Sequence, residues 1–259
     1  MTSSLLPPTP LQPRKRAILV GACGGLGTVL ARKLAHEGWA LALIARDADC
    51  PEALCAELNA GGTAHTLAYE HDVNNTREVP ALLKRIIADL GGLDLIIYNA
   101  GINLPPGMEK LNAEDDIQMI EVNLLGAVAW LAPVGDLFKE AKNGMIVGIS
   151  SVAGDRGRIT NPGYNTSKAG LSTYLEALRN RLTRHGVHVL TVKPGFIATD
   201  MLRASAGPKP FTVSPERAAD DIYQAFCRRK QVIYTHPIWR WIMLVLTHTP
   251  SVIFRRLNF

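Results

Sequence analysis

A tyrosine and a lysine four residues apart are the side chains in this sequence best suited to move a proton. Tyr164 and Lys168 stand in the run Tyr-Asn-Thr-Ser-Lys, and at that spacing both lie on one face of a helix. A free phenol has a pKa of about 10, and a fixed cation beside it favours the phenolate and lowers that pKa. The pair is therefore a candidate acid and base for a reaction that gives a proton to a developing alkoxide.

A glycine-rich turn near the N-terminus indicates what could accompany that proton. In the run Val20-Gly-Ala-Cys-Gly-Gly-Leu-Gly27, the glycines at 21, 25 and 27 follow a predicted strand and open a predicted helix. Missing side chains there let backbone N–H groups approach a pyrophosphate at the helix N-terminus. Gly24 also fits a glycine at every third position, so two spacings remain open. A tight turn that binds no ligand is the alternative.

The elements that must position these groups alternate along the chain. Apolar runs and amphipathic segments follow each other from residue 16 to residue 235, which is typical of βαβ units and a buried parallel sheet. Right-handed crossovers then predict a single-domain α/β protein with a Rossmann fold, a doubly wound, mostly parallel seven-stranded sheet with helices on both faces. The predicted strands are Ala17 to Val20, Ala40 to Ala45, His65 to Tyr69, Leu93 to Tyr98, Met145 to Ser150, Val187 to Val192 and Gln231 to Thr235. The clearest predicted helices are Leu26 to Glu37, Thr76 to Leu90, Glu114 to Phe138 and Tyr164 to His185.

Length and composition favour one domain with two extensions. A chain of 259 residues that is 47% apolar can bury a large core. Residues 1–13, rich in Pro, Ser and Thr, predict a flexible arm; residues 14–235 form the domain, and residues 236–259 a tail. Without metal-ligand spacing or a secretory segment, the four cysteines predict no metal site, no disulfide framework and a reducing, cytoplasmic location. They are Cys23, Cys50, Cys55 and Cys227.

The positive charge of this chain is concentrated at its C-terminal end. The 38 residues after Asp221 hold six Lys or Arg and no acid, which leaves 22 basic and 23 acidic residues before them. A nucleic-acid surface would spread basic residues over a groove or stack them with aromatic side chains on a known module. Neither pattern is visible, so we expect no nucleic-acid binding.

One connection is long enough to cover a ligand. Residues 198–213 contain Gly207, Pro208 and Pro210 and show no period, which indicates an irregular loop. A helix restarts at Ser214-Pro-Glu, with serine as N-cap and proline at the first helical position. Because long loops at the carboxyl ends of strands often close over ligands, this loop is a candidate substrate lid.

Several motifs in order resemble the classical short-chain dehydrogenase/reductase family over roughly residues 16 to 235. They are the glycine turn, Asn99-Ala-Gly101, Asn123 in the next helix, Ser151 with Tyr164 and Lys168, and Pro194-Gly195. The resemblance implies a nicotinamide-dependent oxidoreductase. The cofactor contacts that it implies fall on Gly21, Gly25, Leu26, Gly27, Arg46, Asp72, Val73, Asn99, Ala100, Gly101, Tyr164, Lys168, Pro194, Gly195, Ile197 and Thr199.

The same resemblance implies catalytic roles. Tyr164 would give the proton to the substrate oxygen, and Lys168 would also bond the nicotinamide ribose. Ser151 would polarise the carbonyl, while Asn123 would hold a water that passes protons through Lys168 to solvent. Ser150 competes with Ser151, but the thirteen-residue spacing to the tyrosine selects Ser151.

One position departs from the family pattern. Val20 stands where the family usually has a threonine whose hydroxyl ties the first turn to the Asn-Ala-Gly segment. We expect Asn99 and the backbone to carry that bonding instead.

The residues after the second predicted strand favour NADP over NAD. A carboxylate there would bond the ribose hydroxyls and repel a 2′-phosphate. The family's selecting acid falls at Ala45, and Arg46 matches the position that pairs with the phosphate. Alternatively, Arg46 is a solvated loop residue and Asp47 takes the ribose. Asp72 matches an adenine-contacting position and could also cap a helix.

The tail, residues 236–259, is apolar, aromatic and basic. Its longest clean apolar run, Trp241 to Leu246, is six residues, against about 20 for a membrane span. Two interpretations remain open: peripheral membrane contact through Trp239, Trp241, Phe254 and nearby arginines, or packing over the pocket or a partner subunit. Both favour a lipophilic substrate, because Met201, Leu202 and Phe211 would line the entrance with the tail. Steroid, retinoid, acyl-chain and prenyl-linked carbonyls all fit.

The sequence therefore predicts an NADP(H)-dependent enzyme that interconverts a small-molecule carbonyl and its alcohol. We expect a homodimer or homotetramer. The alternative is a catalytically silent NADP(H)-binding sensor or scaffold that docks to membrane or protein through its tail.

Overall fold

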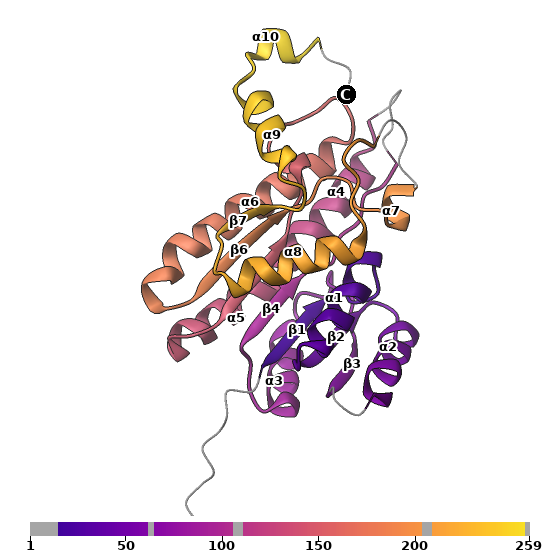
Figure 1. Cartoon of the computed structure of the whole chain (residues 1–259), viewed down its shortest axis with the longest axis vertical. Coiled ribbons are helices and arrows are strands. Elements are labelled where there is room, and N and C mark those ends of the chain that lie inside the picture. Colours follow the sequence, from indigo (N-terminus) through magenta and orange to yellow (C-terminus); the bar gives the residue numbers. More distant parts are fainter. Residues whose placement is uncertain (1–14, 62–64, 106–110, 204–208, 257–259) are drawn as a thin grey trace, which may run out of the picture.

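A seven-stranded sheet forms the centre of the protein in this computed structural model (Figure 1). The structure describes residues 15–61, 65–105, 111–203 and 209–256, so the predicted arm at 1–13 lies outside the described residues. Every strand pairing is parallel, in the order β3-β2-β1-β4-β5-β6-β7. The strands are β1 (Arg16–Val20), β2 (Ala40–Ala45), β3 (Thr66–Glu70), β4 (Leu95–Tyr98), β5 (Met145–Ile149), β6 (His188–Lys193) and β7 (Val232–Tyr234). The predicted fold is confirmed, and strand limits differ from prediction by at most two residues.

Helices bury apolar stripes on both faces of the sheet. One face is covered by α1 (Gly25–His36), α2 (Asp49–Ala60) and α8 (Pro215–Cys227), with Leu30 and Ile222 in its core. The other face is covered by α3 (Val79–Leu90), α5 (Gly126–Ala141) and α6 (Pro162–Leu182), with Trp130 and Leu171 in its core. Because both faces are covered, β1, β4 and β5 are almost entirely buried, as their continuous apolar runs require.

The strand order reverses at β1, which places a crevice at the carboxyl ends of the strands. From β1 the chain winds through β2 to β3 on one side, and then returns to β4 on the other. Ligands of open α/β sheets bind at this switch point, outside the carboxyl ends of the strands. Residues that follow β1, β4, β5 and β6 therefore converge at the same edge.

The predicted helix Glu114 to Phe138 is interrupted. It consists of α4 (Ala113–Ile120), a π-helical turn η1 (Glu121–Leu125) and α5. The combined stretch, residues 113–141, is long and apolar enough to cross a membrane by composition alone. Its α5 part instead buries Trp130, Val134 and Phe138 against the sheet, as a core helix does.

The predicted lid and the helix after it are present in outline. Residues 204–208 of that loop lie outside the described residues. The short helix α7 (Asp200–Arg203) precedes them. An isolated bridge joins Ile197, before that helix, to Val213, after the undescribed residues. Ser214 caps α8 by accepting from Arg217 N, as predicted.

The tail forms α9 (Ile238–His248), which begins beside the residues that follow β6, and α10 (Ser251–Phe254), which lies farther from the sheet (Figure 1). Trp239 and Met243 form an apolar cluster with Val152, and Phe196 packs against it. Arg156 donates to the carbonyls of Leu246 and Thr247 at the end of α9. The inner face of the tail therefore belongs to the domain. Its outer face is exposed, at Trp241, Leu244 and Val245.

One cysteine pair differs from the expectation that no disulfide forms. Cys23, in the glycine turn, is bonded to Cys50, in the first turn of α2. Free thiols are found at Cys55, which is buried, and Cys227, which is exposed. Sequence spacing could not show this pairing, because β2 brings together two residues that lie 27 apart.

The disulfide should stabilise the oxidised protein. Closing a loop of this length reduces the entropy of the unfolded chain, so Cys50→Ser should lower the free energy of unfolding by about 3 kcal/mol. Urea denaturation of the oxidised proteins measures this difference. Cys227→Ser, which removes an exposed free thiol, is the control and should leave stability unchanged. Equal stability of oxidised wild type and Cys50→Ser would contradict the assignment.

Candidate active site

The glycine turn after β1 is shaped for close backbone approach. Gly21 has φ +85°, and a Cβ added there would lie 2.5 Å from Ala100 N. A Cβ at Gly25 would lie 2.9 Å from Thr199 Cγ2, and one at Gly27 would collide with the Gly21 carbonyl. A Cβ at Gly24 meets nothing within 4 Å. The fold thus requires glycine at 21, 25 and 27, which selects the first of the two spacings, and the turn opens α1 as a pyrophosphate site requires.

Asn99 ties that turn to the neighbouring strand. Its side-chain amide donates to Gly21 O at 2.7 Å, and its backbone N–H donates to Val20 O at 2.9 Å. The expectation that Asn99 and the backbone replace the bond missing at Val20 is confirmed. The segment Asn99 to Gly101 therefore lies directly against the turn.

The two serines at the end of β5 have different surroundings. Ser151 is 8% exposed, and its hydroxyl accepts from Ala153 N, which caps the short turn η2 (Val152–Gly154). Ser150 donates to Lys168 O at 2.9 Å and shares a hydrogen bond with Ser172. Ser150 is thus occupied in holding α6, and Ser151 is the serine that interacts with the Tyr164 hydroxyl.

The start of α6 fixes the position of Tyr164. Asn161 adopts a left-handed conformation with φ +56° and accepts from Tyr164 N as the N-cap. Its amide also donates to Asn103 and to Leu104 O. Gly163 N donates to Asp116 of α4 at 2.8 Å. Three separate segments therefore hold the first turn of the helix, and the tyrosine remains partly accessible.

Lys168 is buried beneath this tyrosine. It is 4% exposed, donates from Nζ to Ile149 O at 3.0 Å, and lies 5.8 Å from the centre of the Tyr164 ring. Burial lowers the pKa of Lys168 to about 8. The amine can therefore change its charge near neutral pH, which suits a group that passes protons.

The π-helical turn η1 carries Asn123 into the same edge. Its side chain is fully buried, accepts from Ile102 N at 2.7 Å, and donates to Ile102 O and to Ser167. Such single π turns inside helices are frequent at functional sites. Asn123 thereby fixes the chain after Gly101 against α6. These bonds all use the side-chain amide of Asn123, so its role in holding a water stays a prediction.

The pKa of Tyr164 is not lowered by its surroundings as expected. Burial raises it, and this effect exceeds the lowering by the Ser151 hydrogen bond and by the charge of Arg158. The acting cation is thus Arg158, while Lys168 is engaged with Ile149 O. Sequence reasoning passed over Arg158, because an arginine in a Gly-rich loop carries no motif signal.

The residues expected at the adenosine end lie at the ends of β2 and β3. Arg46 is exposed and pairs loosely with Asp47 at 3.6 Å, so its guanidinium is accessible to a ligand. Asp72 accepts from Asn74 N in a local turn. The expectation that Asp72 caps a helix is wrong, since α3 begins only at Val79.

The residues after β6 connect the turn, the lid and the tail. Pro194 O accepts from Val152 N, and the indole of Trp239 lies directly against Gly195. Thr199 contacts Gly25 through its methyl group. Phe211 of the lid packs edge-on to Trp239, with ring centres 6.2 Å apart. The structure thus brings Phe211 of the lid against Trp239 of the tail, and the predicted entrance role of Met201 and Leu202 stays a prediction.

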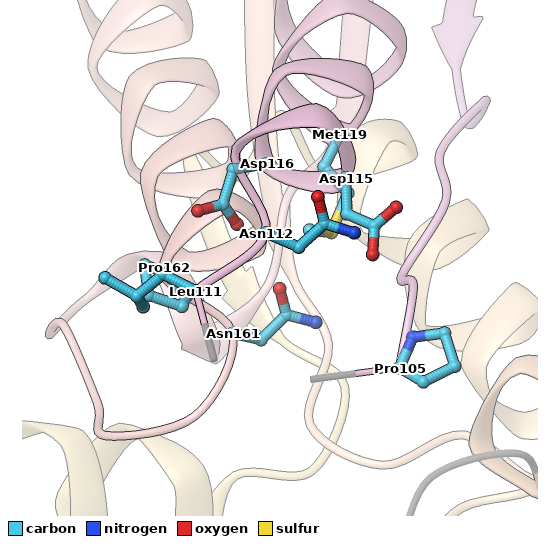
Figure 2. Close-up of a pocket in the computed structure, with 8 residues that line it drawn as sticks. All are labelled: Pro105, Leu111, Asn112, Asp115, Asp116, Met119, Asn161 and Pro162. Carbon is cyan, nitrogen blue, oxygen red and sulfur yellow. The ribbon is translucent and has the colours of Figure 1, made fainter. Parts of the chain in front are cut away.

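A small pocket lies beside the first turn of α6 (Figure 2). Asn161 and Pro162 line it from one side and Asn112, Asp115, Asp116 and Met119 from α4, with a volume of about 20 Å³. That volume suits about one water.

The chain was matched by a family model and by several known proteins. Residues 15–209 match the family described as short chain dehydrogenase. An uncharacterised oxidoreductase of Myxococcus xanthus is 34% identical over 206 residues, covering 80% of this chain and 81% of the relative. A 3-oxoacyl-[acyl-carrier-protein] reductase of Synechocystis is 33% identical over 186 residues, covering 71% and 75%. A short chain dehydrogenase from Burkholderia cenocepacia, solved in complex with NADP, has a TM-score of 0.79 at 24% identity, covering 95% and 98%.

Burial of the Lys168 amine should cost stability that depends on pH. Because its pKa falls to about 8 in the fold, charging it at pH 7 costs on the order of 3 kcal/mol relative to the unfolded chain. Lys168→Met removes this cost and a hydrogen bond of about 1 kcal/mol. We therefore expect the variant to be more stable than wild type by roughly 2 kcal/mol at pH 7.

The stability difference between wild type and Lys168→Met should depend on pH in a defined direction. Between the folded pKa and the higher unfolded pKa, only the unfolded chain keeps the proton, so the wild type gains stability as pH rises through this window. Urea denaturation at pH 7 and at about pH 9.5 should show the advantage of Lys168→Met shrinking. The exposed Lys84→Met serves as the matched control. A pH-independent difference would contradict the burial effect.

Proposed function

The chain belongs to the short-chain dehydrogenase/reductase family of oxidoreductases, and on that premise we propose that it reduces a ketone or aldehyde with NADPH, or oxidises the corresponding alcohol. The observation that carries the proposal is the convergence of Ser151, Tyr164 and Lys168 at the edge where the glycine turn lies. Relatives with 33% and 31% sequence identity to this chain are named as 3-oxoacyl-[acyl-carrier-protein] reductases. That argues against a silent sensor, which would need no such acid.

The cofactor would lie along the carboxyl edge of β1. The glycine turn is shaped for the pyrophosphate, and Arg46 offers an accessible guanidinium for a 2′-phosphate. The neighbours from Burkholderia cenocepacia and Sphingobium yanoikuyae were solved with NADP and NADPH. When bound, the nicotinamide supplies or accepts a hydride at carbon. Asp72, Val73 and the residues from Pro194 to Thr199 are proposed as its further contacts.

The chain's own residues would handle the proton. Tyr164 donates its hydroxyl proton to the substrate oxygen as charge develops there. Ser151 hydrogen-bonds the same oxygen and holds it against the phenol. Lys168 then returns a proton towards Tyr164, and Asn123 keeps the surrounding chain in place for the water that links them to solvent. Each step uses a side chain already fixed by hydrogen bonds.

The substrate is proposed to have an apolar body. Met201 and Phe211 of the lid keep more than two fifths of their surfaces exposed at the proposed entrance, and Phe211 packs on Trp239 of the tail. Such surfaces favour lipophilic compounds over sugars.

The tail offers a surface for assembly. We propose a cytoplasmic homodimer or homotetramer, with the exposed outer face of α9 available for subunit contact. Peripheral membrane contact through residues 236–259 rests on composition alone.

Replacing the proposed acid should abolish turnover and leave binding intact. Tyr164→Phe keeps the ring but removes the hydroxyl, so the rate of carbonyl reduction should fall at least 100-fold, the usual contribution of a general acid. NADPH oxidation with a panel of lipophilic ketones measures this, and fluorescence titration of NADPH checks binding. Tyr174→Phe, on the same helix, is the control. Full activity of Tyr164→Phe would defeat the mechanism, and NADPH binding without turnover in wild type would favour the sensor.

Arg46 should set the cofactor preference. Loss of a charge-assisted phosphate contact costs about 1.5–3 kcal/mol, so Arg46→Ala should weaken NADPH binding by a factor of ten or more. NADH binding should change little. Titration of both cofactors against wild type, Arg46→Ala and the exposed Arg77→Ala decides the matter. Equal affinity of wild type for the two cofactors would sink the NADP assignment.

A further inference from the structure

We infer that Arg158 binds a carboxylate of the substrate, so that the site acts on oxo acids in preference to neutral ketones. The inference rests on the proposed function, because it concerns the same carbonyl group and the same tyrosine. It is carried by the Arg158 side chain, which lies in the loop between Ser151 and Tyr164 and whose buried Nε has no hydrogen-bond partner among the described residues.

Arg158 lies in the loop that joins the serine to the tyrosine of the site. This loop, residues 155–161, leaves η2 after Ser151 and ends at Asn161, the N-cap of α6. Asn161 is held by Asn103 and Leu104, so the end of the loop is fixed. Arg158 is only partly exposed, and its charge acts on Tyr164. A group bonded to Tyr164 would therefore lie close to the guanidinium.

The guanidinium of Arg158 is unpaired within the part of the chain that the structure describes. Its Nε is buried and has no hydrogen-bond partner among the residues that the structure describes. Other arginines with buried heads are satisfied. Arg179 bonds Val189 O, Thr191 and Gln231 O, and Arg156, two residues away, bonds two carbonyls of the tail and stacks on Phe254.

The unsatisfied Nε of this half-buried guanidinium is costly, and its chemistry points to one kind of ligand. Withdrawing a guanidinium from water costs free energy unless hydrogen bonds to an anion replace the lost hydration. Arginine stays charged at any ordinary pH, so it cannot avoid this cost by losing its proton. Its planar fork matches a carboxylate with two parallel hydrogen bonds. A substrate carboxylate would supply the missing partner.

The position also limits the length of the substrate's polar end. The reacting oxygen must reach Tyr164 and Ser151, while the carboxylate reaches Arg158, which acts on the same phenol. Because Arg158 and Tyr164 are six residues apart at the start of α6, the proposal takes 2-oxo and 3-oxo acids, in which few bonds separate carbonyl and carboxylate. The apolar body of the substrate would extend towards Ile159, which is 57% exposed, and the lid. The substrate class is thus an amphipathic oxo acid.

Matched acids and esters test this inference directly. The probes are 2-oxooctanoate and 3-oxooctanoate, each paired with its methyl ester, which keeps the ketone and removes the charge. Wild type with NADPH should show a kcat/KM at least tenfold higher for the acids, since hydrogen bonds to charged groups contribute about tenfold or more. Arg158→Leu should lower kcat/KM for the acids roughly 10- to 100-fold, mainly through KM. The esters should change less than twofold, and Arg158→Lys should retain part of the preference. The exposed Arg184→Leu is the matched control.

A binding measurement separates this inference from the proposed function. Calorimetric titration of 2-oxooctanoate in the presence of cofactor should show binding to wild type that Arg158→Leu loses. Loss of binding without any turnover of carbonyl compounds would refute the proposed function and leave the role of Arg158 supported.

Three results would overturn the role of Arg158. Wild type could show no preference for acid over ester, which would decide the matter even if Arg158→Leu failed to fold. The variant could reduce and bind acids as well as wild type. Finally, acid and ester could lose activity equally while the pH profile of kcat shifts, which would make Arg158 a positioning residue for the Tyr164 proton.

Discussion

The attachment of helix α6 to the end of β5 is the constraint on which the whole site depends. Lys168 donates to Ile149 O, and Ser150 donates to Lys168 O, so strand and helix are bonded in both directions. Ser151 follows that strand directly, and Tyr164 lies one helical turn before Lys168. Because the same two hydrogen bonds hold both sides, serine and tyrosine cannot separate without breaking buried bonds. Asn123 adds a third support from η1 through Ser167.

The loop between the serine and the tyrosine connects this rigid centre to the parts that distinguish the chain. Asp155 accepts from Tyr234 and pairs with Lys193, and Arg156 bonds the end of α9. Arg158 lies in the same loop, and its charge acts to lower the pKa of Tyr164. Tail and site are thus joined through one short segment, so displacement of the tail would be felt at Arg158.

The sequence predicted features that depend on the pattern of apolar residues along the chain or on residues that are neighbours in sequence. All seven strands were found because buried parallel strands read as continuous apolar runs, and the Ser214 cap was found because capping uses neighbouring residues. The π turn at Asn123 was missed, since one extra residue in a helix leaves its apolar pattern intact. The Cys23–Cys50 bond and the place of Arg158 depend on how distant segments meet. The prediction that Asp72 could cap a helix was wrong, because Asp72 lies in a local turn with Asn74 and α3 begins only at Val79.

The electrostatics of the site set the protonation state in which the proposed acid starts. Burial raises the pKa of Tyr164, so the phenol keeps its proton at neutral pH and is ready to act as an acid. Reduction of a carbonyl needs an acid, whereas oxidation of an alcohol needs the phenolate as a base. The positive charge of Arg158 acts against burial by stabilising the phenolate. A substrate carboxylate would neutralise that charge and remove its stabilisation of the phenolate. Pairing of Arg158 with an oxo acid and donation of a proton by Tyr164 would therefore support each other.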